Sequence, residues 1–285
     1  MTIAGDDHIT LLSWNLAGRV RKAPSQIAFI AERAPHIVAF QEVTKNTLPI
    51  LKDALGANGY DYTADSFSEA DGALLVGPRR YGELIGSRFP ISRLPANNFD
   101  LPWPERVLSV MLEAPGIAIE LHTTHIPPGS SNGWVKIETL EGIFRRLAKT
   151  SATARILCGD FNTPQKELSD GTVVTFGQTI RPNGEVFLGK RVGGREDPTG
   201  RWDAGERNIL CGLKAFDMPD MFRAVHGYSV REASWFMRRK GKIFARRFDH
   251  IFASRSLNAL ACRYLHQPRE VGLSDHSAIE ATFSP

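Results

Sequence analysis

The sequence predicts a layered α/β fold, and three observations predict it. The first part of the chain alternates short buried strands with helical patterns, the middle part holds several strands joined by turns, and the last strand alternates apolar with polar residues. The chain has 285 residues, 42% of them hydrophobic, which is enough for a large core. Layered α/β domains of roughly 250 residues occur as single units. Since no linker interrupts the pattern, we expect one domain over residues 1–285.

Two strand-then-helix units open the chain. Apolar residues over 9–14 predict a buried strand that ends at Asn15, and helical spacing follows Pro24. A second short strand over 36–40 ends at Gln41-Glu42. We expect Thr44 to cap the next helix and Gly56 to end it.

The middle of the chain predicts strands rather than helices. The expected strands cover 73–76, 84–91, 107–112 and 117–126, with a turn at 114–116. An amphipathic helix with Ile137, Leu140 and Phe144 on its apolar face then leads into a buried strand at 156–158.

The last third begins with a glycine-rich, charged stretch. From about 177 to 205 we expect a long surface excursion that carries Lys190, Arg191, Arg195 and Arg201. Helical patterns resume near 208–213 and 220–225. A strand over 247–253 and a half-buried strand that includes 279–283 complete the chain.

Composition excludes several classes of protein. No apolar run approaches the roughly 20 residues that a membrane span requires. The acidic start of the chain lacks the basic and apolar segments of a secretory signal. Cys158, Cys211 and Cys262 lie far apart without a Cys-x-x-Cys motif, which is typical of a reduced cytoplasmic protein and argues against a thiolate zinc site.

The segment Gly159-Asp160-Phe161-Asn162 follows the buried strand at 156–158. If Phe161 points into the core, Asp160 and Asn162 both project the other way, into one space. Such a pair either staples a loop or holds a water molecule and a phosphate oxygen. The second interpretation is favoured by similar polar residues elsewhere in the chain.

Polar residues of matching chemistry stand at the ends of several predicted strands, where layered α/β proteins build their sites. Carboxylate and amide oxygens suit a hard divalent cation such as Mg²⁺. Histidines have an ordinary pKa near neutrality and suit proton transfer. These residues are Asn15, Glu42, His125, Asp160, Asn162, Asp249, Asp275 and His276.

Six short motifs in this order resemble those of the endonuclease/exonuclease/phosphatase superfamily, which includes DNase I, AP endonucleases, sphingomyelinases and inositol-polyphosphate phosphatases. The resemblance extends from Leu11 to Phe283 and implies a four-layer α/β sandwich, in which helices flank two central mixed sheets. It also implies a metal-dependent phosphoester hydrolase. The motifs are Trp14-Asn15, Gln41-Glu42, Thr124-His125, Gly159-Asp160-Phe161-Asn162, Asp249 within RFDHIFAS, and Ser274-Asp275-His276.

The resemblance also implies a role for each residue. Glu42 matches the principal metal ligand, and Asn15 helps to hold the metal and phosphate region. Asp275 matches an aspartate found at a second metal position or braces the loop of His276. The implied metal is Mg²⁺, with Mn²⁺ as an alternative.

The remaining motif residues match catalytic groups. Asp160 positions the attacking water or the leaving oxygen, and Asn162 contacts the phosphate. His276 acts as base or stabilises the transition state, and Asp249 orients it. His125 is a general acid or a phosphate contact.

We assign no catalytic role to four further side chains outside the motifs. Trp235 belongs either to the core or to a surface that stacks against a base or sugar. We expect His122 to face away from His125, His250 to be a packing or surface histidine, and Arg106 to be a surface or strand-edge charge.

Three functions fit the sequence, and a nuclease acting on DNA is favoured. Residues 238–247, RRKGKIFARR, contain six cations and no acid, which is typical of either a solvated face or a polyanion footprint. A net charge of only +4 and His125 instead favour a small-molecule or lipid phosphate as substrate. The third function is non-catalytic nucleic-acid binding. Abasic-site specificity is not expected, because Val43 and Thr44 follow Glu42 and because His125 stands where AP endonucleases usually carry tyrosine.

Overall fold

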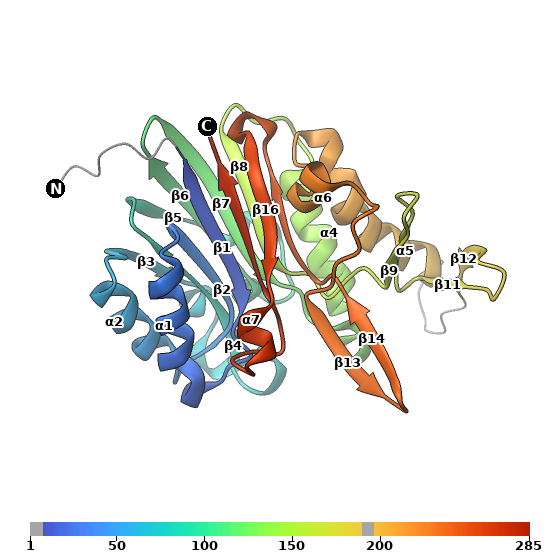
Figure 1. Cartoon of the computed structure of the whole chain (residues 1–285), viewed down its shortest axis with the longest axis horizontal. Coiled ribbons are helices and arrows are strands. Elements are labelled where there is room, and N and C mark those ends of the chain that lie inside the picture. The colour runs from blue at the N-terminus through green and yellow to red at the C-terminus, as the bar shows by residue number, and fades with distance from the viewer. Residues whose placement is uncertain (1–7, 190–196) are drawn as a thin grey trace.

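The computed structural model describes residues 8–189 and 197–285, and two β-sheets pack against each other at its centre (Figure 1). Helices cover the outer face of each sheet. The predicted four-layer α/β sandwich is therefore confirmed. Lys190, Arg191 and Arg195 of the expected surface excursion lie outside the described residues.

The first sheet has six strands in the order β16-β17-β1-β2-β4-β3. Its β1 and β2 are parallel, and its other neighbours are antiparallel, so the sheet is mixed. Its strands are β1 (Ile9–Asn15), β2 (Ile37–Thr44), β3 (Tyr62–Asp65), β4 (Tyr81–Ser87), β16 (Ala259–Leu265) and β17 (Ala278–Phe283).

The second sheet has five strands in the order β15-β8-β7-β6-β5. Here only β7 and β8 are parallel. Its strands are β5 (Ile91–Leu94), β6 (Val107–Ala114), β7 (Ile117–His125), β8 (Ala154–Asp160) and β15 (Asp249–Ala253).

Alternation along the strands builds three apolar layers. Leu11 points into the core between the sheets, where it belongs to the same cluster as Leu121 and Ile156 of the second sheet. Its neighbour Leu12 points the other way, toward the helices that cover the first sheet. Because both faces of both sheets are covered, the central strands are apolar on both sides, as the sequence pattern indicates.

The longer helices each bury one face against a sheet. The helices α1 and α2 cover the first sheet, with Ile27 and Leu51 inward, and α4 and α5 cover the second, with Leu140 and Trp202 inward. Within the described ranges, no helix combines the length and the apolar character that crossing a membrane requires. The helices are α1 (Ala23–Arg33), α2 (Leu48–Ala57), α3 (Gly129–Asn132), α4 (Val135–Leu147), α5 (Pro198–Arg207), α6 (Met221–His226) and α7 (Gln267–Glu270).

Three two-stranded ribbons extend from the loops. The third of them, β13–β14, projects from the body of the molecule (Figure 1). The ribbons pair β9 (Lys166–Glu167) with β10 (Val173–Val174), β11 (Gln178–Ile180) with β12 (Val186–Leu188), and β13 (Trp235–Arg239) with β14 (Lys242–Arg246).

Three local predictions in the first part of the chain are wrong. Residues 73–76 are not a strand, because the Asp71 carboxylate accepts a hydrogen bond from the backbone N–H of Ala73 and turns the chain into a short 3₁₀-helix. Thr44 does not cap α2, which begins after Thr47. The expected strand over 84–91 is two strands, since β4 ends at Ser87 and β5 begins at Ile91.

The expected surface excursion over 177–205 is also corrected. Its first part forms the β11–β12 ribbon, but its last part is the helix α5, whose Trp202 is buried against α4. The indole N–H of Trp202 donates to the Glu206 carboxylate at 2.8 Å. A polar, glycine-rich sequence therefore forms a helix here, and the buried side chain of Trp202 holds that helix against α4.

A buried ion-pair network ties the β9–β10 ribbon to the body of the protein. The Glu167 carboxylate accepts two hydrogen bonds from Arg247, both at 2.7 Å, and two from Arg223 at 3.2 and 2.7 Å. Burial alone would raise the pKa of Glu167 above its ordinary 4.5, but the two guanidinium groups outweigh burial and lower that pKa to about 2.

We predict that Glu167→Gln lowers the free energy of unfolding at pH 7 by about 3 kcal/mol, because buried Arg223 loses its carboxylate partner and buried Arg247 is left with Asp220 alone. A depressed folded-state pKa stabilises the protein above pH 4.5, and this stabilisation is lost as the pH falls toward and through about 2. Urea unfolding at several pH values should therefore show the difference between wild type and variant shrinking below about pH 4.

The matched control is Glu185→Gln, which removes the exposed partner of Arg181. This change should alter stability by less than about 1 kcal/mol at any pH. A pH-independent deficit in Glu167→Gln would contradict the ion-pair explanation.

Candidate active site

The predicted polar residues meet at one edge of the two sheets. Strand register places His125 and Asp249 opposite Asp160, and Asn15 ends the neighbouring β1 of the other sheet. A cavity of about 830 Å³ opens there. Asn15 and Asp249 are buried beneath it, and its lining includes Glu42, His125, Asp160, Asn162, Trp235, Asp275 and His276.

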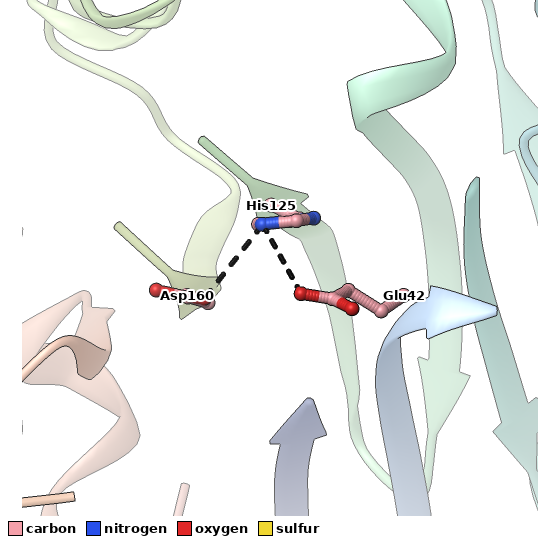
Figure 2. A group of neighbouring side chains, drawn as sticks. All are labelled: Glu42, His125 and Asp160. Atoms are coloured by element: carbon pink, nitrogen blue, oxygen red, sulfur yellow. Dashed lines mark ion pairs between the residues drawn. The ribbon is translucent and has the colours of Figure 1, made fainter. Parts of the chain in front are cut away.

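One carboxylate oxygen, Oδ2 of Asp160, lies at the centre of this cluster. It accepts hydrogen bonds from Asn15 Nδ2 at 3.0 Å and from Asn162 Nδ2 at 3.4 Å. The Nε2 atoms of His276 and His125 lie 3.7 and 3.8 Å from it. Figure 2 shows the imidazole of His125 between the carboxylates of Asp160 and Glu42, whose Oε1 is 3.6 Å from His125 Nε2. Four nitrogen groups thus face a single anionic oxygen.

His276 and Asp249 form an oriented pair. The Nδ1 atom of His276 is 2.9 Å from Asp249 Oδ2, and both residues are buried. Burial alone would lower the pKa of His276, but the carboxylates of Asp249 and Asp160 outweigh it and raise that pKa to about 10. Burial raises the pKa of Asp160 to about 7 despite the opposing effect of His276. The geometry therefore favours a charged His276 over a free base.

The backbone is unusual at two of these residues. Glu42 has φ 54° and lies in a β-bulge between Phe40 and Val43, and Asn162 has φ 51° after Asp160. Left-handed backbone is costly for residues with a side chain and is concentrated at functional sites. Gly159 is needed for a different reason, since its φ of 138° brings the strand so close to β7 that a Cβ would collide with the Thr124 carbonyl. These features aim Glu42 and Asn162 at the cavity.

Arg106 fixes the proton of His125. Its Nη1 atom is 2.7 Å from His125 Nδ1, and its other amino group donates to the Pro78 carbonyl. A guanidinium group can only donate, so Nδ1 of His125 must accept, and the ring proton must lie on Nε2. Burial and the charge of Arg106 also lower the pKa of His125 well below its ordinary value. His125 is therefore a neutral hydrogen-bond donor that faces the cavity through Nε2–H, and it has no lone pair for a metal there.

This contact overturns the expectation that Arg106 is a surface or strand-edge charge. Arg106 is only 2% exposed and lines the cavity. The sequence held no local signal for its burial, because its partners Pro78 and His125 are distant in the chain.

Glu83 is a second residue near the site that sequence reasoning missed. It is fully buried on β4, opposite the bulge that contains Glu42, and neither of its carboxylate oxygens has a hydrogen-bond partner among the described residues. Burial raises its pKa well above the ordinary value, and Arg106 opposes that shift. An acid within the apolar run of β4 was the signal that could have found it.

The loop after Asp160 is supported from α4 and α5. Lys136 donates to the Asn162 carbonyl at 2.9 Å and to Glu206 at 2.5 Å, and Thr163 donates to Glu206 at 2.8 Å. His250 is buried beneath the same loop, within hydrogen-bonding distance of Asp220 and the Thr163 carbonyl. It is a packing histidine, one of the two alternatives expected. His122 faces away from the cavity, as expected, toward Ser109.

The comparison with family models decides which family the chain belongs to. The model described as the Endonuclease/Exonuclease/phosphatase family matches residues 12–276, nearly the whole chain.

The chain belongs to this family.

Members of the endonuclease/exonuclease/phosphatase family hydrolyse phosphoester bonds, so the chain is a phosphoester hydrolase. No curated protein matches the chain significantly in sequence.

Solved structures agree with the fold of the endonuclease/exonuclease/phosphatase family. An AP endonuclease from Archaeoglobus fulgidus has a TM-score of 0.67 at 19% identity over 97% of this chain and 100% of its own. D. rerio TDP2, complexed with single strand DNA product, has a TM-score of 0.65 at 15% identity over 98% and 100%. The 3′ phosphatase NExo from Neisseria, bound to a product DNA hairpin, has a TM-score of 0.63 at 17% identity over 96% and 99%. At these identities the likeness shows the fold alone.

The family generally depends on a divalent metal, and the acidic groups of this site fit one. The carboxylate oxygens of Glu42 and Asp160 lie within 4.8 Å of each other, whereas the nearby Nε2–H of His125 is a donor and not a ligand. A single amide, Nδ2 of Asn15, holds the Glu42 and Asp160 carboxylates at 3.1 and 3.0 Å. Two carboxylates placed side by side form an oxygen-rich group that suits a hard cation.

The other two predicted metal ligands, Asn15 and Asp275, each have another partner in the protein. The amide oxygen of Asn15 accepts a hydrogen bond from the Ala17 backbone N–H and faces away from the cavity, so Asn15 bridges the two carboxylates here. Asp275 lies on the cavity rim, half-exposed, with Arg19 at 3.7 Å. Their assignment as ligands stays a prediction.

We predict that ¹⁵N spectra of metal-free protein will show His125 as the Nε2–H tautomer, because Arg106 occupies its Nδ1 lone pair. Arg106→Ala should remove that bias and yield mixed tautomers, whereas Arg80→Ala, which removes another cavity arginine that has no contact with His125, should not. An Nδ1–H tautomer with Arg106 intact would contradict the assignment.

Proposed function

We propose that the chain is, as one domain, a divalent-metal-dependent phosphodiesterase that uses Mg²⁺ and acts as a nuclease on DNA. The observation that carries this proposal is the convergence of Glu42, Asp160, Asn162, His125 and the His276–Asp249 pair on one cavity. Lys136, which is paired with Glu206, lines the cavity wall. Four arginines without an ion pair among the described residues also line it, which favours a polyanionic substrate: Arg80, Arg106, Arg239 and Arg246.

Similar structures support DNA as the substrate. D. rerio TDP2 holds single strand DNA product, and the Neisseria 3′ phosphatase holds a product DNA hairpin. We propose DNA for this chain as well, because its own cavity is lined by cations.

The residues of the chain divide the chemistry among them. Asp160 orients the attacking water and accepts its proton, since a pKa of about 7 makes its carboxylate a competent base near neutral pH. His276 is held as a cation by Asp249 and donates from Nε2 to a phosphate oxygen as negative charge develops there. His125 donates from its own Nε2, and Asn162 completes the phosphate contacts. A divalent metal held by Glu42, with Asn15 and Asp275 as further predicted ligands, would supply Lewis-acid neutralisation of the phosphate.

We predict that His276→Ala and Asp160→Asn each lower kcat by about 10²- to 10⁴-fold, because each removes a group that acts on the reacting atoms. Hydrolysis of bis-p-nitrophenyl phosphate with Mg²⁺ measures this, and circular dichroism checks the fold. The control His226→Ala removes a histidine of α6 that is bound to the Cys262 carbonyl, away from the cavity. Near-normal turnover in either site variant would refute the assigned roles.

We further predict that EDTA abolishes hydrolysis and that Mg²⁺ or Mn²⁺ restores it. A substrate panel then separates the possible functions: single- and double-stranded DNA, RNA, and phosphorylated lipid head groups. A nuclease should lose DNA affinity steeply as salt rises, since phosphate contacts release counterions. Activity confined to small or lipid phosphates would replace the DNA proposal with a phosphatase.

A further inference from the structure

The β13–β14 hairpin has two faces of different character. Residues opposite one another in an antiparallel pair share a face, and the pairs Trp235↔Arg246, Met237↔Phe244 and Arg239↔Lys242 alternate with the pairs of the other face. We call the face with these six residues the inner face. All of them except Lys242 line the active-site cavity. The outer face carries Phe236, Arg238, Ile243 and Ala245.

The inner face interleaves apolar and cationic side chains. Met237 is 37% exposed although it is apolar, and Trp235 stacks on Phe248 with ring centroids 5.2 Å apart. The guanidinium of Arg246 lies 5.7 Å from the ring of Phe244. Flat or apolar groups beside cations form a surface to which bases and phosphates can bind together.

The hairpin carries cations that no carboxylate of the described residues pairs with. Residues 235–246 contain five cations and no acid, and none of these cations forms an ion pair within the part of the chain that the structure describes. Uncompensated cations on a projecting ribbon are complementary to a phosphate backbone. They are Arg238, Arg239, Lys240, Lys242 and Arg246.

The inner face is continuous with the catalytic centre. Trp235 pairs with His276 through an isolated β-bridge, and the Ser277 N–H donates to the Ser234 carbonyl at 2.8 Å. From Trp235 to Arg239 the strand extends about 13 Å, the reach of about four stacked nucleotides. A chain whose phosphate lies at His276 can therefore run along the inner face.

We infer that the inner face of the β13–β14 hairpin binds unpaired nucleotides of a nucleic-acid strand that leads into the active site. This inference rests on the proposed function and specifies its substrate. Bases in a duplex are stacked on one another, so a duplex exposes only base edges and phosphates. Trp235, Met237 and Phe244 could then not pack on the face of a base. Unpaired bases can pack on these side chains while their phosphates meet Arg239, Lys242 and Arg246.

Fluorescence anisotropy with a labelled oligothymidylate, in EDTA to prevent turnover, tests the inference. Phe244→Ser should weaken binding by about tenfold, since it removes a base-packing ring. Arg239→Gln should lower the slope of log Kd against log salt by about 0.7, the value of one phosphate contact on a single strand. An oligouridylate distinguishes RNA from DNA, and a blunt duplex of equal length should bind less tightly than the single strand.

The sequence offers a matched control beside each variant. Ile243→Ser and Arg238→Gln change neighbouring residues on the outer face. Each variant should keep its Kd within about twofold of the wild-type value, and its slope of log Kd against log salt within about 0.2 of that of wild type. Circular dichroism checks that all four variants fold. Equal losses from inner and outer variants, or equal binding of duplex and single strand, would overturn the inference. Turnover of bis-p-nitrophenyl phosphate by wild type tests the proposed function separately, because anisotropy in EDTA requires no catalysis.

Discussion

A single buried oxygen, Oδ2 of Asp160, holds the functional edges of both sheets together. It accepts from Asn15, which ends β1 of the first sheet, while the carboxylate itself belongs to β8 of the second. The other oxygen of Asp160 accepts from the Asn162 backbone N–H at 2.9 Å and sets the turn of the following loop. Burying a carboxylate is expensive unless donors surround it. The surrounding nitrogens therefore stabilise the charge and at the same time place the groups that a phosphate would meet.

The same cluster lowers the stability of the fold, and other parts of the protein offset this loss. Glu42 and Asn162 adopt left-handed backbone, and the carboxylates of Glu42, Asp160 and Asp249 crowd one region. Strain and like charge at a site usually reflect selection for function over stability. Here the compensation lies outside the cavity, in the filled layers between the sheets and beneath the helices, and in buried ion pairs such as Glu167 with Arg247.

Much of the fold and the site could be predicted because their signals are local. Strand ends follow from apolar runs, and the polar residues at or next to these ends, such as Asp160 at the end of β8 and His276 just before β17, meet once the strands align. Arg106 and Glu83 could not be predicted, because their burial depends on partners far away in the chain and on a bulge that opposes them. The hairpin was missed for another reason: each of its faces mixes cations with apolar residues, so neither face resembles a core strand.

Helix α5 is another element that the local sequence did not predict. Gly200 and Gly205 weaken its intrinsic helix propensity, but Gly205 packs closely on Ile137 and Trp202 fills the layer beneath. Tertiary packing therefore decides what local sequence leaves open.

The position of the last strand has a consequence for the timing of assembly. β17 lies between β16 and β1, so the strand formed by Ile9–Asn15 is completed on one side only by Ala278–Phe283. The Trp14 indole also donates to the His276 carbonyl, and the Ser274 hydroxyl donates to the Asn15 carbonyl. Pairings between such distant segments form late and slowly. While the chain is still being synthesised, the first sheet lacks β17 and the imidazole of His276 is not yet held in place. The protein can therefore hydrolyse its substrate only after synthesis has passed Phe283.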